Sequence, residues 1–556
     1  MRIYFFVFIF ITFIVSCSKK DEPVAIPPDA AVSTLACSFA TATPVAIAGS
    51  EYSGVITVPY TGGNGAIYNA GAPIASTGLT GLTATLQGGT LSYGQGNFIY
   101  VVTGTPSATG AASFAISFGS LSCTFSLAVG EQPLIQYGTP FTGVPDGRDA
   151  VIYQVNMRAF SSSRNFQGVI NRLDSIKALG VNVIYLMPVY TVGIFKAINS
   201  PYCVKDYKAV NTEFGTLTDL RNLIDGAHSR GMAVILDWVA NHTSWDNAWI
   251  DSHKDWYKQD GAGNIVSPSM GWNDVAQLNF SNAAMRLEMI RCMKYWVYTV
   301  NCDGFRCDYA DGPPNDFWIQ AIDTLRNIRT HNLLMLAESN NTSKYGAGFD
   351  YIFGFNFYSK LKSIFSNNVS VQTIDNINNS DYNGVLNSRQ QVVRYLTNHD
   401  VNSSEGTTLD LFGGSSGSMA AFVATACMKG VPMIYNGQEV GTTYRLYFLT
   451  LGNTINWNQN QPMVEEYKKI IAIRNSSVPI RRGQLTSYSN TNICAFTKEQ
   501  GAEKVFVASN LRNTSISYTL PASVANSTWT DAMNGASVSL TSQLNLAPYS
   551  YRIFKK

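Results

Sequence analysis

Residues 217–242 read LTDLRNLIDGAHSRGMAVILDWVANH, and this stretch shows how the middle of the chain is built. In residues 217–229 apolar side chains recur every three to four residues, which predicts an amphipathic helix. Residues 233–237 begin with a short apolar run, which predicts a buried strand, and more polar residues follow where the strand ends. A helix that leads directly into a buried strand is the repeating unit of a parallel β/α fold.

The same pattern recurs between residues 149 and 478. The predicted strands are residues 151–155, 183–187, 233–237, 303–306, 333–337, 351–355, 392–396 and 431–435. Amphipathic stretches such as residues 282–298 separate several of them. Eight strands over this length predict the α/β fold class, as a (β/α)8 TIM barrel. A small excursion, residues 243–280, is expected after the third strand.

The two flanks of this barrel have a different composition. Residues 35–132 carry little charge, are rich in Gly, Thr and Ser, and contain short alternating runs, which predicts an antiparallel β-sandwich. Residues 479–556 return to short alternating strands and predict a C-terminal antiparallel β-domain. The sandwich is either a glycan-binding module or a spacer, and we favour a spacer because it contains no clear cluster of polar and aromatic residues.

The first residues resemble an export signal. One basic residue precedes an apolar run over residues 3–15, which is short for a membrane span. The run ends in IVSC (residues 14–17), which resembles a bacterial lipobox, and the chain then turns polar. We expect residues 1–17 to be a lipoprotein signal peptide, Cys17 to be lipidated, and residues 18–34 to be a linker. A short membrane anchor is the alternative. The mature protein would be exported and membrane-anchored, at the outer membrane, the cell surface or a periplasmic face.

The composition excludes some partners and cofactors. The 556-residue chain has 39 basic and 37 acidic residues, and its net charge of +2 provides no field for binding nucleic acid.

Its nine Cys are too few for a disulfide scaffold. Cys37 and Cys123 bracket the sandwich, and export permits them to pair, so we predict a disulfide, with two buried thiols as the alternative. The later Cys residues lack C-x-x-C spacing, which gives no support for zinc.

Four predicted strands are followed by short motifs rich in polar residues. These are DWVANH (237–242), GFRCD (304–308), AES (337–339) and TNHD (397–400). In a β/α barrel the C-terminal ends of the strands carry the chemistry. A single Asp or His there is usually a satisfied buried group, but four such endings in register are hard to explain by packing alone. Carboxylates, Arg and His around one barrel mouth suit cleavage of a glycosidic bond by a carboxylate pair.

Asp308 and Glu338 are the predicted pair. Asp308 lies two residues after Arg306, so both side chains point to the same face of a strand, and the guanidinium favours the charged carboxylate that must attack the anomeric carbon. Glu338 follows an apolar strand, and apolar surroundings raise the pKa of a carboxyl that has to hold its proton. Asp400 is the third carboxylate, expected to bind sugar hydroxyls and to stabilise an oxocarbenium-like transition state.

In this order the motifs resemble the signature regions of glycoside hydrolase family 13, the α-amylase family. Asp308 stands at the position of the family nucleophile, Glu338 at the general acid/base and Asp400 at the transition-state stabiliser. Further matches are residues 180–188, 206–207, 214–216 and 430–439. The resemblance covers roughly residues 149–556.

The resemblance also implies roles for neighbouring side chains. Tyr202 matches the aromatic residue that stacks on the sugar at the cleavage subsite. Asp237 is expected to lie behind the substrate and to fix Arg306. His242 and His399 are expected to donate hydrogen bonds to hydroxyls of the same sugar ring.

The family implies retaining hydrolysis of α-linked glucans such as starch, glycogen or maltooligosaccharides through a covalent glucosyl-Asp intermediate. The two carboxyl groups should then lie about 5–5.5 Å apart. Residues 277–279 (QLN) look more like neopullulanases and cyclomaltodextrinases. A hydrolase of that type, a transferase of the same family and an inactive glycan-binding member are the alternatives. The sequence leaves open α-1,4 or α-1,6 preference, endo or exo attack, and the oligomeric state.

The chain departs from the family pattern in one place. Asp311 and Gly312 stand where many α-amylases have a Lys-His pair that helps to bind the leaving sugar and calcium. Asn241 matches a calcium ligand of the family and Asp274 is the candidate partner ligand, so Ca²⁺ is left open as a cofactor.

The excursion, residues 243–280, also carries tryptophans that are either sugar platforms or local core: Trp245, Trp249, Trp256 and Trp272.

Overall fold

The computed structural model describes residues 28–556, so the predicted signal peptide, Cys17 and part of the linker lie outside the described residues. The chain divides into two compact units, one up to Pro133 and one from Leu134 to Lys556. Within the described residues, no helix has both the length and the apolar character needed to cross a membrane.

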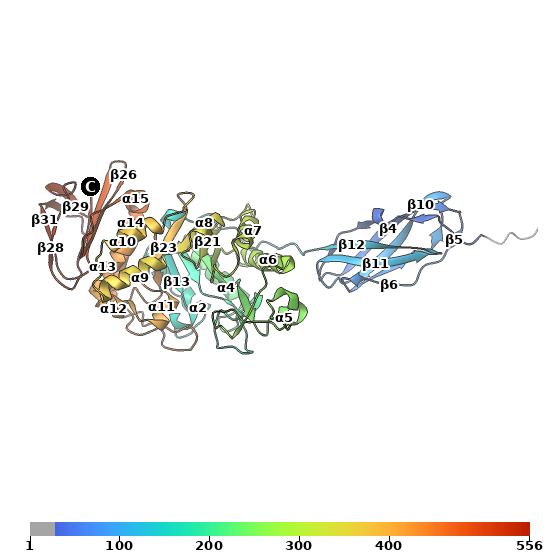
Figure 1. Cartoon of the computed structure of the whole chain (residues 1–556). Helices are drawn as coiled ribbons and strands as arrows, with labels where there is room; N and C mark the ends of the chain where they lie inside the picture. Colours follow the sequence, from blue (N-terminus) through green and yellow to red (C-terminus); the bar gives the residue numbers. More distant parts are fainter. Residues whose placement is uncertain (1–27) are drawn as a thin grey trace, which may run out of the picture. The chain divides into compact units, whose positions relative to one another are not determined.

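The first unit contains two main β-sheets and a small hairpin (Figure 1). One sheet contains β1 (Thr34–Leu35), β2 (Thr41–Thr43), β4 (Tyr52–Gly63), β6 (Ile74–Ala75), β8 (Leu82–Leu86) and β10 (Gly94–Gly104). The other contains β3 (Ala46–Ile47), β7 (Thr77–Gly78), β11 (Gly110–Phe118) and β12 (Leu121–Gly130), and the hairpin is β5 (Ile67–Tyr68) with β9 (Gly89–Thr90). The pairings are antiparallel except for the two-residue pair of β3 with β12, which is parallel.

The two sheets of this unit enclose an apolar core and are linked by a disulfide. Along β4 and β10 buried and more exposed residues alternate, because successive side chains of a strand point to opposite faces. Phe98, Phe114 and Phe125 are fully buried in the resulting core. Cys37 and Cys123 are joined by a disulfide, which connects the short 3-10 turn before β2 to the first part of β12.

The second unit is built on a closed barrel of eight parallel strands, as the sequence predicted. The strands are β13 (Ile152–Val155), β14 (Val183–Leu186), β17 (Ala233–Trp238), β20 (Gly304–Cys307), β21 (Leu334–Ala337), β22 (Tyr351–Phe353), β23 (Gln391–Tyr395) and β24 (Val431–Tyr435). Each predicted strand overlaps its observed counterpart. Most residues of these strands are buried, as expected for parallel strands covered by helices on the outside and by side chains within.

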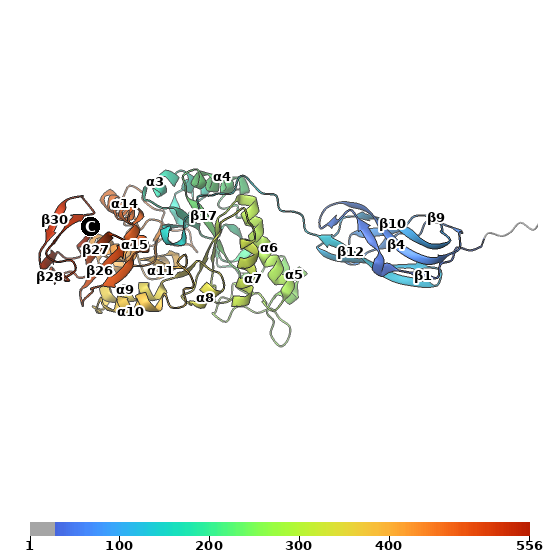
Figure 2. The same ribbon diagram turned by 90° about the horizontal axis from the view of Figure 1, so that it is seen from above.

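Helices surround the barrel strands (Figure 2). They are α1 (Met157–Phe160), α2 (Phe166–Ile170), α3 (Leu173–Ala178), α4 (Leu217–His228), α6 (Ala283–Val300), α7 (Asn315–Arg326), α8 (Ser343–Gly346), α9 (Phe355–Ser366), α10 (Thr373–Ser380), α11 (His399–Ser404), α12 (Thr408–Leu411), α13 (Gly414–Cys427) and α14 (Gln461–Ser476). Two hairpins stand beside the barrel: β15 (Tyr190–Val192) with β16 (Val204–Val210), and β18 (His242–Ser244) with β19 (Val275–Gln277), which flank α5 (Trp249–Ser252).

The local interactions of α4 explain why residues 217–242 form a helix followed by a strand. Thr216 and Asp219 form a capping box, in which the side chain of each residue accepts a hydrogen bond from the backbone N–H of the other. These bonds satisfy N–H groups that would otherwise have no partner at the start of the helix. The side chains at the helical spacing are buried against the barrel: Leu220, Leu223, Ile224 and Ala227. The chain then turns through Gly231, which has a φ of +68°, and enters β17.

The C-terminal part consists of a short helix and a six-stranded sheet. They are α15 (Val478–Arg482), β25 (Gln484–Ser487), β26 (Ile493–Gln500), β27 (Glu503–Asn510), β29 (Ser527–Asp531), β30 (Ser537–Leu540) and β32 (Tyr551–Lys555), with a separate pair of β28 (Ile516–Thr519) and β31 (Gln543–Leu546). One face of the sheet, including Phe496, Val507 and Ile553, belongs to the same apolar core as the barrel. The sheet is therefore packed onto the barrel within one compact unit.

Candidate active site

The barrel brings the predicted site residues to one end. Asp237 of β17 pairs in register with Arg306 of β20, and Asp308 follows β20 directly. Glu338 follows β21, the next strand around the barrel. Asp400 lies in α11, which begins where the chain leaves β23. All of these positions are at the C-terminal ends of strands, which meet at the same rim.

Arg306 connects three carboxylates at this rim. Its guanidinium is buried, with Nη1 2.7 Å from Oδ1 of Asp237 and 3.0 Å from Oδ1 of Asp308. Nη2 lies 2.5 Å from Oε1 of Glu338. The carboxyl groups of Asp308 and Glu338 are thus both bound to one planar cation, which fixes them on the same side of the rim.

The charges around Arg306 do not balance. One guanidinium faces three carboxyl groups, and burial together with the facing Glu338 carboxylate raises the pKa of Asp308 well above its usual range. Arg306 acts in the other direction but does not offset these effects. The prediction that Arg306 keeps Asp308 charged is therefore wrong, because burial and the Glu338 carboxylate outweigh the guanidinium. The raised pKa means that the carboxyl group of Asp308 holds a proton more readily than an isolated carboxyl group would.

A chain of hydrogen bonds supports the aromatic side of the rim. Gln154 Nε2 lies 2.8 Å from Nδ1 of His399, and His399 Nε2 lies 2.7 Å from the hydroxyl of Tyr202. That hydroxyl donates to Oδ2 of Asp237 at 2.9 Å, and Tyr185 donates to the same oxygen at 2.6 Å. If Gln154 donates to Nδ1, Nε2 of His399 carries the ring proton and donates to Tyr202. The chain therefore holds the Tyr202 ring and Asp237 in fixed positions.

Both predicted histidines are buried. Burial lowers the pKa of His399 to about 4, with the nearby Arg306 acting in the same direction. Burial likewise lowers the pKa of His242 to about 4. At neutral pH both rings are therefore uncharged, and each can donate one hydrogen bond and accept another.

Most of the predicted site residues share one cavity with a volume of about 470 Å³, whereas Arg306 and Asp237 are buried and are not among its lining residues. It is lined by Tyr202, His242, Asp308, Glu338, His399 and Asp400, together with Asp274, Tyr309, Asp311 and several apolar side chains. The side chain of Asp400 is about half exposed and lies 3.4 Å from Nε2 of His399. The cavity therefore offers acceptors and donors for hydroxyl groups beside the carboxylate pair.

The structure distinguishes among the tryptophans of the excursion. Trp272 lines the cavity and makes edge contacts with His242 and Tyr309. Trp249 and Trp256 pack against each other, and Trp249 stacks on Tyr207. Only Trp272 of these three lines the cavity that holds the carboxylates, so it is the candidate sugar platform.

Sequence reasoning missed several residues of the site. Gln154 lies in β13 and contacts His399, and the only signal for it is a polar residue within an apolar strand. Tyr309 follows Asp308, and its backbone N–H donates to Oε2 of Glu338 at 2.7 Å. Its φ of +38° is unusual for a residue with a side chain, and no sequence pattern announces it.

The two predicted calcium ligands, Asn241 and Asp274, lie at opposite ends of one strand pair. The side-chain oxygen of Asn241 is buried and has no hydrogen-bond partner, so it could accept a cation. In the antiparallel pair of β18 with β19, however, His242 lies opposite Gln277 and Ser244 opposite Val275. Asn241 is therefore next to one end of the pair and Asp274 next to the other. Within residues 28–556 no group of three or more His, Cys, Asp or Glu could hold a metal ion.

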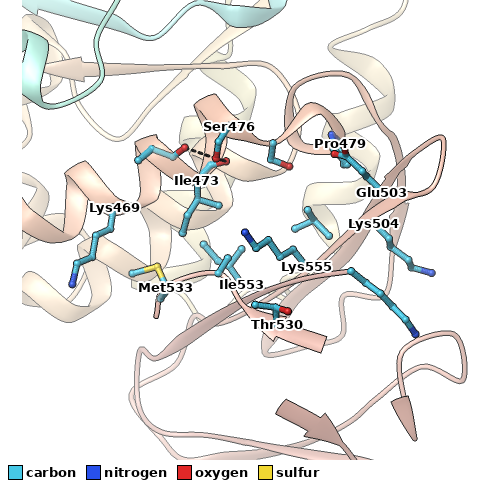
Figure 3. Close-up of a pocket in the computed structure, with 15 residues that line it drawn as sticks. Lys469, Ile473, Ser476, Pro479, Glu503, Lys504, Thr530, Met533, Ile553 and Lys555 are labelled. Carbon is cyan, nitrogen blue, oxygen red and sulfur yellow. Dashed lines mark hydrogen bonds between the residues drawn. The ribbon is translucent and has the colours of Figure 1, made fainter. Parts of the chain in front are cut away.

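A second cavity, about 730 Å³ in volume, lies between α14 and the C-terminal sheet (Figure 3). Lysines from both parts line it, including Lys469 and Lys555, and Glu503 is the one carboxylic residue among its lining residues. None of the predicted catalytic residues lines this cavity. Chemistry that needs a carboxylate pair therefore belongs to the cavity at the barrel rim.

Comparison with known proteins places the chain in a family. A family model of the α-amylase catalytic domain matches residues 159–269 and 269–517, and a model of the maltogenic amylase C-terminal domain matches residues 484–553. Alpha-amylase 2 of Dictyoglomus thermophilum is 26% identical over 414 residues, which cover 69% of this chain and 69% of that protein. A cyclomaltodextrinase of Thermoanaerobacter pseudethanolicus is 24% identical over 371 residues, 62% of this chain and 63% of that protein.

Solved structures share the fold. The crystal structure of an α-amylase from Lactobacillus plantarum has a TM-score of 0.67 at 24% identity, and the match covers 74% of this chain and 99% of that one. The catalytic-domain model spans more than half of the present chain. The chain therefore belongs to glycoside hydrolase family 13, the α-amylase family, and is a glycosidase.

Proposed function

We propose that this glycosidase cleaves α-1,4-glucosidic bonds of starch, glycogen or maltooligosaccharides with retention of configuration. The observation that carries the proposal is the convergence of Asp308 and Glu338 on the guanidinium of Arg306. A retaining mechanism needs two carboxyl groups close enough to act on one glycosidic bond from opposite sides.

In the first step Asp308 attacks the anomeric carbon and the bond to the leaving oxygen breaks. Glu338 gives its proton to that oxygen, so the leaving sugar departs as an alcohol and the retained sugar becomes an ester of Asp308. The position of both carboxyl groups on the guanidinium of Arg306 supports their action on one glycosidic bond, because both are held at the same rim. Asp400 would bind hydroxyls of the retained sugar. Both ring nitrogens of His399 are engaged by Gln154 and Tyr202, so His399 would act by holding the Tyr202 ring.

In the second step Glu338 takes a proton from water, which attacks the ester and releases Asp308. Inversion in each step gives net retention at the anomeric carbon. If a sugar hydroxyl replaces water, the same steps give transglycosylation. The names of the cyclomaltodextrinase and maltogenic amylase relatives support oligosaccharide substrates and make a cyclomaltodextrinase-like hydrolase the second candidate.

We also propose that the enzyme is exported and anchored to a membrane by lipid on Cys17. The support is the sequence of residues 1–17 alone. A protein purified from its native membrane should carry a lipid-modified N-terminal Cys, detectable by mass spectrometry of the N-terminal peptide. In Cys17→Ala the protein should no longer sediment with membranes, and unchanged sedimentation would contradict the proposal.

The decisive test of the activity is product analysis on maltoheptaose and pullulan, with the anomeric form of the first products followed by proton NMR. Reducing sugar should be released as the α-anomer and should be absent with Asp308→Asn. Faster cleavage of a cyclomaltodextrin than of starch would favour the second candidate. Release of no sugar from any α-glucan would overturn the hydrolase proposal.

A further inference from the structure

We propose that Arg158 is a positioning residue that limits the length of the sugar chain retained on the enzyme, because it ties two loops into a wall at one end of the active-site cavity. The inference rests on the proposed function and specifies one property of the same site, the length of its products. It is carried by the hydrogen bonds of Arg158 and by the residues that line the cavity.

Arg158 lies in α1, just after the first barrel strand, and its side chain is only 2% exposed. Nε and Nη2 bind the two carboxylate oxygens of Glu213 at 2.8 and 2.7 Å. Nη1 donates to the carbonyls of Asn199 and Phe448 at 2.6 and 2.7 Å, and Nη2 also donates to Oδ1 of Asn199 at 3.1 Å. These bonds use all five N–H donors of a guanidinium, so none remains for substrate.

The loop that contains Phe448 is held by its carbonyl groups. Besides the bond from Arg158, the carbonyls of Tyr447, Leu449 and Gly452 accept from side chains of Asn156, Asn199 and Arg164 at 3.3, 2.9 and 2.8 Å. Each donor lies far from the loop in the sequence. Moving the loop away from the barrel would therefore break several bonds at once, and buried donors left without a partner cost free energy.

The clamped segments line the catalytic cavity. Ile198, next to Asn199 on one loop, and Phe448 and Leu449 on the other loop are all among its lining residues. The ring of Phe448 packs edge-on against Tyr202, with 6.0 Å between ring centroids, and against His399, with 5.0 Å. The clamp therefore presents a largely apolar surface beside the aromatic support of the cleavage subsite.

This wall stands on the side of the retained sugar. Glu338 protonates the leaving oxygen, so the leaving part of the substrate lies on the side of Glu338. Asp311 is on this side, because its carboxylate accepts a hydrogen bond from Ser339, the residue after Glu338. The retained sugar is the one that Asp308 attacks and that lies against Tyr202. Any further retained units must extend past Tyr202 toward Phe448 and Leu449, whose apolar side chains offer sugar hydroxyls no partner.

The test is the length of the first products released from maltoheptaose, compared between the wild type and Arg158→Ala. The wild type should release mainly one short product at early times. In Arg158→Ala the ratio of this product to longer ones should fall by about tenfold, the scale of discrimination that pocket shape commonly provides. The rate on 4-nitrophenyl α-glucoside, which needs only one retained sugar, should change much less than the product ratio.

Two further variants separate this role from a general effect on folding. Asn199→Gly keeps the left-handed backbone at this position, where φ is +61°, but removes the side chain that binds Leu449 and Arg158, so it should shift the products in the same direction. Arg326→Ala is the matched control. Arg326 also binds two carbonyls and a carboxylate, but at the opposite end of the barrel, so this variant should lose stability without a shift in products.

An unchanged product ratio in both Arg158→Ala and Asn199→Gly, or an equal shift in Arg326→Ala, would overturn the inference. A wild type that cleaves no α-glucan would instead overturn the proposed function, so the two failures are distinguishable.

Discussion

The hydroxyl of Tyr202 lies 2.7 Å from Nε2 of His399, and the two rings stack with 5.5 Å between centroids. The same hydroxyl donates to the buried carboxylate of Asp237. An aromatic ring at the edge of the catalytic cavity is thus fixed from behind by a histidine and by the carboxylate that binds Arg306. The position of the ring and the orientation of Arg306 are coupled through Asp237.

Tyr202→Phe should weaken this coupling while keeping the ring. Loss of one donor to a buried carboxylate should lower the free energy of unfolding by about 1–3 kcal/mol. The value of kcat/KM should fall by about tenfold or more, since misplacing Arg306 also disturbs Asp308. Urea unfolding and kinetics on maltoheptaose measure the two effects. Tyr93→Phe, which changes an exposed tyrosine of the sandwich, should alter neither.

Glu338→Gln should slow the first chemical step more on substrates whose leaving group needs a proton than on substrates whose leaving group does not. On maltooligosaccharides the first step should slow by about 10²–10⁴-fold, the usual contribution of general acid catalysis. With 2,4-dinitrophenyl α-glucoside, whose leaving group departs without a proton, a burst of phenolate should still appear in stopped-flow experiments. Equal losses on both substrates would show that Glu338 is not the acid.

The buried histidines should make stability depend on pH. The pKa of His399 is about 4 in the folded protein and 6.5 in the unfolded chain, so stability is greatest above pH 6.5 and falls as the pH drops toward 4. Between pH 7 and 4.5 His399 should account for a loss of about 2–3 kcal/mol. His399→Gln should lack this part of the loss. Between pH 7 and 4.5 the free energy of unfolding of this variant should therefore fall by about 2–3 kcal/mol less than that of the wild type. A constant difference across this range would contradict the low pKa.

The disulfide should stabilise the N-terminal unit without affecting catalysis. Cys37 and Cys123 are 86 residues apart, and closing a loop of that length stabilises a fold by about 4–5 kcal/mol in the chain-entropy model. The double variant Cys37→Ser, Cys123→Ser should therefore lower the melting temperature of a fragment that ends at Pro133, which is a compact unit. Activity of the full chain on maltoheptaose should stay the same. A fall in activity would mean that the sandwich contributes to the site.

The barrel could be predicted because its strands are short apolar runs that end abruptly in polar residues. Asp308 and Glu338 were found in this way, each at the end of such a strand. Gln154 was not found, because it contributes to the site through a contact with His399, a residue 245 positions later in the chain. The clamp around Arg158 could not be predicted for the same reason, since its partners Asn199 and Phe448 lie in loops far apart in sequence.

The balance of charge at the rim could not be predicted from local spacing either. The position of Arg306 two residues before Asp308 suggests a simple ion pair. In the folded chain the same guanidinium also binds Asp237 and Glu338, which come from two other strands, and the pKa of Asp308 is raised. The relative position of Asn241 and Asp274 could not be predicted either, because it depends on the register in which β18 pairs with β19.

The most direct test of the account is to trap the covalent intermediate. In Glu338→Gln, α-glucosyl fluoride should react normally, since fluoride leaves without a proton, but hydrolysis of the ester should be slow because the base is missing. Mass spectrometry of peptic peptides after rapid acid quenching should then find one glucosyl unit on the peptide that contains Asp308. A glucosyl unit on another carboxylate, or turnover of the fluoride with inversion and no adduct, would contradict the assignment of Asp308 as the nucleophile.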